Sequence, residues 1–200
     1  MVERRKYQGV LNILSFNRHF YVIGALMLLV LMVVYTVGLI SPAFAGIVAL
    51  FILYGLIAPL IVSAYVYDFS GYYEMNWLTN GQNKTDTRSI LNIHSGFDET
   101  SFILQGKFPT SDIKALDFYN PEAHTEEAIK RARKVTDNFA NTYSMDSSKI
   151  PEKSQSVDLI CLLSAAHEIR DKEERVLFLK ECRRVCKPDG RIVVLSLIHI

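Results

Sequence analysis

The sequence is poor in the residues that build disulfide frameworks and zinc sites. Its 200 residues include only three cysteines, Cys161, Cys182 and Cys186. An odd number of cysteines without a Cys-x-x-Cys pair excludes a disulfide scaffold, and no pair of histidines completes a zinc site. We therefore expect three reduced thiols, which suit a cytoplasmic compartment, and no bound metal.

The sequence also lacks an excess of charge of one sign. Its 22 basic and 21 acidic side chains leave a formal net charge of +1. Proteins whose main partner is a nucleic acid usually carry a basic surface, so we expect no nucleic-acid partner. Charged residues make up 22% of the sequence and aromatic residues 11%, which excludes a disordered or collagen-like chain.

Charged side chains are missing altogether from residues 20–67, which contain no Asp, Glu, Lys or Arg. One crossing of a bilayer needs about 20 apolar residues. The uncharged stretch is therefore long enough for two crossings. Pro42 divides it, because proline interrupts a helix. The sequence predicts two transmembrane helices, at residues 20–40 and 43–67.

The charges before this hairpin predict its orientation. Arg4, Arg5, Lys6 and Arg18 precede the first crossing, against Glu3 alone. A basic flank favours the cytoplasmic side, and two crossings return the chain to that side. We therefore expect an integral protein of the cytoplasmic membrane, with the bilayer as a partner and both termini in the cytoplasm.

Three other interpretations of the hairpin remain open. A cleaved signal peptide would end near residues 43–45 (AFA), although the apolar run before them is long for a signal. A hairpin buried in a soluble core would need a larger partner than the rest of the chain. The third interpretation is a re-entrant or interfacial hairpin that does not fully cross the bilayer. It stays open because the tip of the hairpin carries no charge that would hold it on the far side.

After the hairpin, short apolar runs alternate with helical patterns. Strands are expected at 89–93, 113–117, 138–143, 157–163 and 191–195. Helices are expected at 98–106, with Asp98 as its cap, and at 124–135 and 172–185. Loops or turns are expected at 81–88 and 187–190. This alternation predicts an α/β fold, with a doubly wound, mainly parallel, Rossmann-like sheet of about five strands. Ligands of such sheets bind beyond the carboxyl ends of the strands.

The order of these segments resembles that of class I S-adenosylmethionine-dependent methyltransferases. The most specific parts are SVDLI (156–160) and KPDGRIVV (187–194), which stand in the order and spacing of that family. The resemblance covers residues 89–195. It implies S-adenosyl-L-methionine as the cofactor and a small-molecule methyl acceptor. The hairpin is compatible with a lipid-soluble acceptor and does not identify one.

The resemblance implies cofactor-binding residues in the stretch ILNIHSGFDET (90–100). Asn92 stands where the family has an acid. Gly96 is the one glycine kept from the glycine-rich loop, and glycine there lets the backbone approach the cofactor. His94 and Ser95 would shape the pocket differently from the family norm. An ordinary strand-to-helix turn is the alternative.

Three more residues follow from the resemblance. Asp117, after the second strand, would accept hydrogen bonds from both ribose hydroxyls. Asp146 would face the adenine amino group, with Tyr143 stacked nearby. His167, after the fourth strand, would take a proton from the acceptor. The alternatives are a solvated turn-capping Asp117, an acidic loop at Asp146 and a packed His167. Asp158 is expected to be structural.

An aromatic connector, residues 68–88, joins the hairpin to the sheet. Together with the preceding Tyr67, its first residues form the sequence YDFSGYY (67–73). Two interpretations remain equally open: a lid over the cofactor, or an interfacial collar under the membrane, where tyrosines are common.

The family's sheet has seven strands, and this sequence stops after the fifth. In addition, LSLIHI (195–200) back-translates to a sequence that resembles a sequencing-library adapter. We therefore expect a truncated gene, inactive as given, with a non-native tail at 196–200. A genuinely short protein is the alternative. The expected segments are a basic terminus (1–19), the hairpin (20–67), the connector (68–88), the methyltransferase-like domain (89–195) and the tail.

The leading hypothesis is thus a membrane-tethered methyltransferase. A non-catalytic cofactor-binding or interaction module is the alternative, because the glycine loop is depleted. A nicotinamide-dependent oxidoreductase is disfavoured, because the sequence lacks Gly-x-Gly-x-x-Gly.

Overall fold

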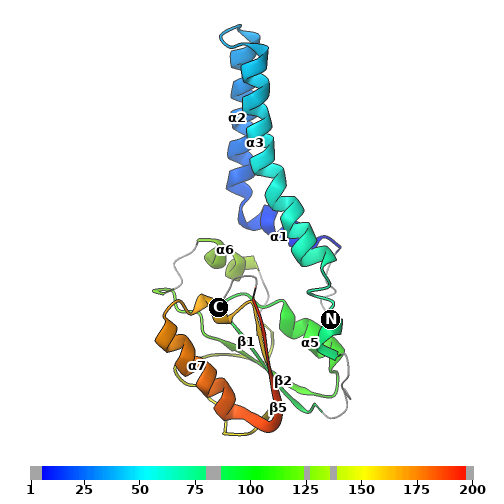
Figure 1. Cartoon of the computed structure of the whole chain (residues 1–200), viewed down its shortest axis with the longest axis vertical. Helices are drawn as coiled ribbons and strands as arrows, with labels where there is room; N and C mark the ends of the chain where they lie inside the picture. The colour runs from blue at the N-terminus through cyan, green and yellow to red at the C-terminus, as the bar shows by residue number, and fades with distance from the viewer. Residues whose placement is uncertain (1–5, 80–86, 124–126, 136–138, 197–200) are drawn as a thin grey trace. The chain divides into compact units, whose positions relative to one another are not determined.

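The computed structural model describes residues 6–79, 87–123, 127–135 and 139–196. It separates into two compact units, of which one ends at Asn76 and the other begins at Trp77 (Figure 1). The division falls inside the aromatic connector, within the short helix α4 (Asn76–Thr79).

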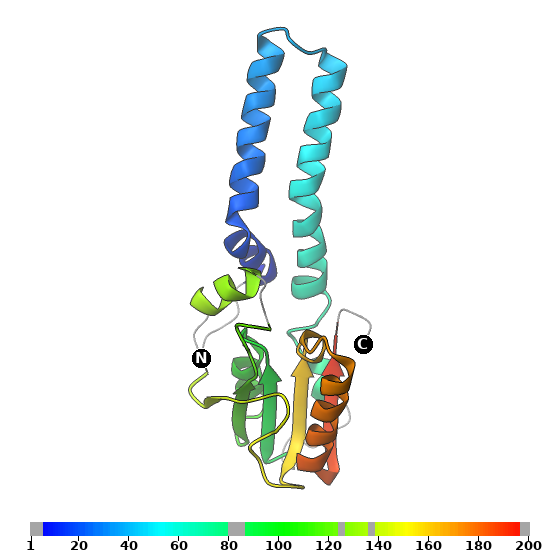
Figure 2. The same cartoon turned by 90° about the vertical axis from the view of Figure 1, so that its left-hand side faces the viewer.

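The N-terminal unit is helical. It contains α1 (Gln8–Phe16), α2 (Arg18–Thr36), α3 (Pro42–Ser63) and a π-helix, η1 (Ala64–Phe69). Figure 2 shows α2 and α3 side by side and antiparallel, joined at one end by a short turn. Ser41 caps α3, since its hydroxyl accepts the Phe44 N–H at 3.3 Å. Pro42 then occupies the first turn, where its missing N–H costs nothing.

Both long helices are apolar enough to cross a membrane. The mean hydropathy is 2.1 for α2 and 2.6 for the span from Pro42 to Phe69. Length and composition alone support this, and a core helix or a signal sequence would pass the same test. Only 6% and 0% of these two stretches are buried within the chain, however, whereas a core helix is mostly buried. The predicted break at Pro42 is confirmed, although α2 already ends at Thr36.

The C-terminal unit is built on one parallel sheet with the strand order β3-β2-β1-β4-β5. Its strands are β1 (Ser89–His94), β2 (Asp112–Asp117), β3 (Thr142–Ser144), β4 (Val157–Leu163) and β5 (Cys186–Leu195). Its helices are α5 (Thr100–Lys107), α6 (Glu127–Val135), the 3-10 turn η2 (Ala166–Glu168) and α7 (Lys172–Val185). Figure 1 shows α5 and α7 on opposite sides of the sheet, so the predicted doubly wound, Rossmann-like α/β fold is confirmed.

The register brings the strand ends to one edge. His94 at the end of β1 pairs with Asp117 at the end of β2. On the other side of β1, Asn92 pairs with Cys161, so β4 ends at the same level. The chain runs outward from β1 to β3 and then returns to β4, which places the topological switch point between β1 and β4. Ligands of open α/β sheets bind at such a point.

The core explains why β4 and α7 match their predicted bounds. Six of the seven residues of β4 are buried, as expected for a strand covered on both faces. On α7, Phe178, Cys182 and Val185 are fully buried against the sheet. Burial of the Phe178 side chain alone contributes about 1.5–3 kcal/mol. Burial also raises the pKa of the Cys161 and Cys182 thiols to about 12, which leaves them protonated and unreactive.

Two sequence predictions are wrong in detail. The stretch 187–190 is not a separate turn but lies within β5, where pairing jumps from Val157 opposite Cys186 to Leu159 opposite Arg191. Residues 187–190, between these two pairs, form a β-bulge. A Cβ on Gly190 would lie 2.9 Å from the Asp158 carbonyl oxygen. The third strand, predicted at 138–143, begins only at Thr142, and residue 138 lies outside the described residues.

One helix begins later than predicted, and the start of another lies outside the described residues. The first begins at Thr100 rather than at residue 98. Asp98 nevertheless caps it, because its carboxylate accepts the N–H groups of Thr100 and Ser101 at 3.0 and 2.9 Å. The charged helix predicted at 124–135 is α6, which is described from Glu127; residues 124–126 lie outside the described residues.

Asp158 joins three segments at the amino end of β4. One carboxylate oxygen accepts from the Lys187 ammonium at 2.6 Å, and the other accepts the N–H groups of Arg88 and Ser89. Burial alone would raise the pKa of Asp158, but these hydrogen bonds outweigh it and lower the pKa below the usual 3.8. Its role is therefore structural, as the sequence suggested.

We expect Asp158→Asn to destabilise the C-terminal unit by about 1–2 kcal/mol at neutral pH, since it removes charge-assisted hydrogen bonds. A lowered native pKa gives stability that is present above the unfolded pKa and is lost as the pH falls through the native pKa. The difference from wild type should therefore shrink below about pH 4. Resistance to proteolysis of the wild type and the variant across a pH series measures this difference in stability. An equal difference at every pH would contradict the structural role of the ionised Asp158 carboxylate.

Candidate functional site

The loops after β1 and β2 are joined through one buried carboxylate. Asp117 is 8% exposed, and its Oδ1 accepts the Gly96 N–H at 2.8 Å and the Tyr119 N–H at 2.9 Å. Gly96 has a φ of +83°, a conformation that favours glycine. The turn therefore presents backbone, and not a side chain, beside the carboxylate.

The second oxygen of Asp117 pairs with the Arg133 guanidinium from α6. Arg133 also stacks over the Tyr119 ring, with 4.3 Å between the guanidinium carbon and the ring centroid. A Cβ on Gly96 would lie 2.9 Å from Arg133 Nη1 and 3.1 Å from the Tyr119 ring, so a larger residue would have to displace these side chains as well as adopt an unfavourable φ. Sequence reasoning missed Arg133 and Tyr119, because nothing in a charged helix marks which arginine turns inward.

His94 lies at the centre of a buried polar cluster. It is 6% exposed, and its two ring nitrogens lie 3.8 Å from Asp98 Oδ2 and from Asp117 Oδ1. Among the described residues, neither ring nitrogen, nor Asp98 Oδ2, nor the Ser95 hydroxyl has a hydrogen-bond partner. Buried polar groups without partners are costly, so a cluster of them is suited to a polar ligand or to water.

Asn92 has a structural role. Its side-chain amide nitrogen contacts Asp98 Oδ1 at 3.2 Å and the hydroxyls of Thr100 and Ser101 at 2.8 Å. It thereby fixes the start of α5 against the end of β1. The amide can donate to Asp98, which a carboxylate in its place could not do.

Asp146 lies at the same edge of the sheet, beyond β3. Ser144 pairs with Asp117, and the Met145 N–H donates to the Asp117 carbonyl oxygen at 2.9 Å. The Asp146 carboxylate is exposed and accepts the Ser148 N–H at 2.8 Å. Hydrogen bonds from Ser148 lower the pKa of Asp146 and keep it ionised at neutral pH. Tyr143, also on β3, is 54% exposed.

His167 lies in η2, directly after β4. Its Nδ1 is 3.1 Å from the Ser196 hydroxyl, and its Nε2 is 3.3 Å from a Glu168 carboxylate oxygen. Ser164, at the turn that leads there, has a φ of +56°, which is uncommon outside glycine and is found at functional sites. Since β4 pairs with β1, His167 and His94 share one edge of the sheet.

The site is therefore a polar cluster at the switch point, with a glycine turn, a buried carboxylate and polar atoms that lack protein partners. Within the described ranges, no three His, Cys, Asp or Glu side chains come together as a metal site. Such an arrangement suits a polar small molecule that carries a diol or amino groups.

Comparison with known proteins agrees with this geometry. Residues 96–194 match the family model described as a methyltransferase domain. Together with the fold, this match supports a class I methyltransferase domain and indicates S-adenosylmethionine as its cofactor. The buried polar atoms of His94, Ser95 and Asp98 that lack partners among the described residues, next to the Gly96 turn, fit a cofactor of this polarity. No curated protein matches the chain.

Several solved structures are similar. A SAM-dependent methyltransferase from Aquifex aeolicus has 18% identity and a TM-score of 0.44, over 62% of this chain and 63% of that one. The PH0226 protein from Pyrococcus horikoshii OT3 has 19% identity and a TM-score of 0.45, over 63% and 57%. A methyltransferase from Methanosarcina mazei has 21% identity and a TM-score of 0.42, over 56% and 53%. The chain thus spans between about half and just under two thirds of these proteins.

Proposed function

We propose that the chain is a membrane-tethered S-adenosylmethionine-dependent methyltransferase with a small, lipid-soluble methyl acceptor. The observation that carries the proposal is the Gly96–Asp117 pair at the carboxyl ends of β1 and β2, within the region that matches the methyltransferase family. In this proposal α2 and α3 cross the cytoplasmic membrane, and residues 89–195 work in the cytoplasm.

Each residue of the cluster has a proposed task in cofactor binding. The backbone at Gly96 lets the cofactor approach β1, and Asp117 accepts hydrogen bonds from the ribose diol. Oδ1 of Asp117 is already bonded to two N–H groups, and Oδ2 is held by Arg133. Full recognition of the diol therefore requires Arg133 to release or share Oδ2. His94 and Ser95 supply polar atoms to the pocket, and Asp146 accepts from the adenine amino group.

The cofactor supplies an activated methyl group on a sulfonium. The protein contributes mainly alignment of the acceptor with that methyl group. Where the acceptor must lose a proton, His167 takes it. The Glu168 carboxylate lies 3.3 Å from Nε2 and orients the ring.

Calorimetry of the detergent-solubilised protein with S-adenosylmethionine tests the proposal. Micromolar binding, together with transfer of a labelled methyl group to a membrane lipid extract, would support it. Binding without any turnover by the full gene product would favour the alternative, a non-catalytic cofactor-binding module. Preference for a nicotinamide cofactor would exclude both. The 200-residue chain is expected to be inactive, and this stays a prediction. It is tested by assaying the 200-residue chain beside a chain extended by its genomic continuation.

We expect His167→Asn in the full gene product to lower kcat by about 100-fold or more, the usual contribution of a general base, while cofactor affinity changes little. Asn keeps the size and polarity of the side chain but cannot take a proton near neutral pH. Steady-state turnover and cofactor titration measure the two effects separately. Equal losses in both, or no loss in either, would make His167 a packing residue.

A further inference from the structure

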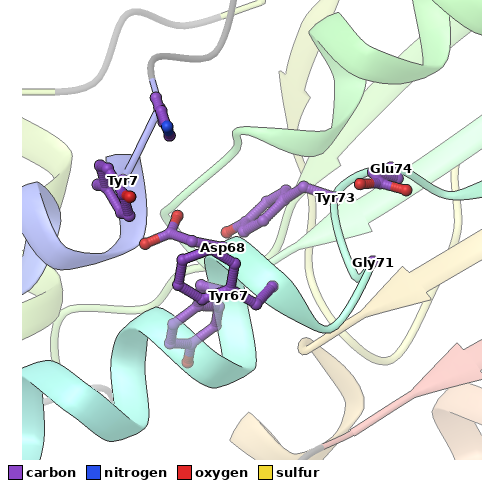
Figure 3. Close-up of a pocket in the computed structure, with 8 residues that line it drawn as sticks. Tyr7, Tyr67, Asp68, Gly71, Tyr73 and Glu74 are labelled. Carbon is purple, nitrogen blue, oxygen red and sulfur yellow. The ribbon is translucent and has the colours of Figure 1, made fainter.

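A pocket of about 420 Å³ lies within the N-terminal unit, at the end of α3 that follows its apolar stretch (Figure 3). Its walls come from three segments: the residues before α1, the π-helix η1 and the turn after it. The lining includes Lys6, Tyr7, Tyr67, Asp68, Tyr73 and Glu74. The methyltransferase proposal uses none of these residues.

The two main walls are fixed to each other. Asp68 of η1 accepts the N–H groups of Gly9 and Val10 at 2.9 and 3.3 Å, so its carboxylate holds the start of α1. A Cβ on Gly9 would lie 2.6 Å from the Tyr67 Cβ, so the close contact between α1 and η1 depends on glycine. The pocket is therefore built by tertiary contacts and is preformed.

Aromatic rings form much of the lining. Tyr7 meets Phe69 edge to face at 5.8 Å, and the rings of Tyr67 and Tyr73 lie 6.2 Å apart. Gly71, with a φ of +77°, turns the chain back so that Tyr73 reaches Tyr67. In Figure 3 the three tyrosines surround Asp68, and Glu74 lies farther along, near Gly71. Aromatic faces next to carboxylates are favourable surroundings for an ammonium group.

The charges in the pocket have both signs. Lys6 supplies a cation, with its Nζ 5.2 Å from the centre of the Tyr7 ring, while Asp68 and Glu74 are acidic. Asp68 accepts two backbone N–H groups of α1, whereas Glu74 is exposed and accepts from the Asn76 amide at 3.3 Å, which leaves Glu74 as the more available carboxylate. A ligand with an ammonium group and a phosphate would match both ends. The pocket also follows directly on an apolar span, and π-helical segments such as η1 often occur at functional sites.

We propose that this pocket binds the zwitterionic head group of an amine-bearing phospholipid, with the ammonium against Tyr67, Tyr73 and Glu74 and the phosphate near Lys6. The site depends on the proposed membrane location of the hairpin but not on methyl transfer. The same chemistry is available from a soluble phosphoamine such as phosphoethanolamine, and the test distinguishes the two sources.

Native mass spectrometry of the full chain in detergent, titrated with dioleoyl phosphatidylethanolamine, tests the proposal. Dioleoyl phosphatidylglycerol has the same acyl chains and no ammonium, and we expect it to bind at least about fivefold more weakly. Tyr73→Leu and Glu74→Gln should each weaken phosphatidylethanolamine binding about three- to tenfold. Tyr54→Leu is the matched control, since Tyr54 is an exposed tyrosine of α3 and should leave binding unchanged.

Equal binding of the two lipids, or an equal loss in Tyr54→Leu, would overturn the proposal. Binding of soluble phosphoethanolamine as tight as that of the lipid would show that the ligand is not a lipid. Circular dichroism of each variant checks that its helices are intact. Lys6→Gln tests the proposed phosphate contact at the other end of the pocket in the same titration. Absence of S-adenosylmethionine binding would disprove the methyltransferase proposal and leave these results standing.

Discussion

Replacing Asp117 by Ala is expected to weaken S-adenosylmethionine binding about tenfold or more. The proposed ribose contact is a pair of charge-assisted hydrogen bonds, whose loss costs on the order of 1.5–3 kcal/mol. The same carboxylate also holds the Gly96 turn through the N–H at 2.8 Å. Its removal therefore weakens both the ribose contact and the backbone beside it. Calorimetric titration of the detergent-solubilised protein measures the loss.

Arg133→Gln provides the matched control, because it breaks the same Arg133–Asp117 ion pair from the other side. If the ion pair competes with ribose, this variant should bind the cofactor about two- to fivefold more tightly. A gain of this size corresponds to the free energy that a partly exposed ion pair contributes. If the ion pair only supports the fold, both variants should lose affinity alike. Unchanged affinity in Asp117→Ala would refute the ribose role outright.

Carbonate washing at high pH is expected to leave the full chain almost entirely in the membrane pellet. Two apolar helices insert together, and transfer of each from water to the bilayer is favourable by on the order of 5 kcal/mol. Neither helix carries an acidic side chain that would oppose insertion. A chain that begins at Trp77, the first residue of the second compact unit, is the control and should appear in the supernatant.

The same membranes test the orientation. Protease added from the cytoplasmic side should cut within the C-terminal unit, and protease added from the other side should not. Release of the full chain by carbonate would contradict the transmembrane hairpin and favour a peripheral, interfacial one. Cleavage from the opposite side alone would reverse the proposed orientation.

Much of the fold followed from local sequence pattern. β4 and α7 match their predicted bounds because a strand buried on both faces needs a continuous apolar run, and a helix on a sheet needs an apolar stripe. The two long helices followed from the absence of charge over residues 20–67. The positions of Gly96 and Asp117 at strand ends were predictable in the same way, because strand ends follow from the pattern.

The partners of these residues were not predictable. Arg133 reaches Asp117 from 16 residues away, and Asp68 holds Gly9 from 59 residues away. The sequence KPDG likewise predicted a separate turn, whereas in the fold it lies within β5 as a bulge, where a Cβ on Gly190 would lie 2.9 Å from the Asp158 carbonyl oxygen. Local sequence determines which face of a strand or helix is apolar and where the element ends. Which polar groups meet is decided when distant elements pack, since a buried charge takes its partner from whichever segment the fold brings within hydrogen-bond distance.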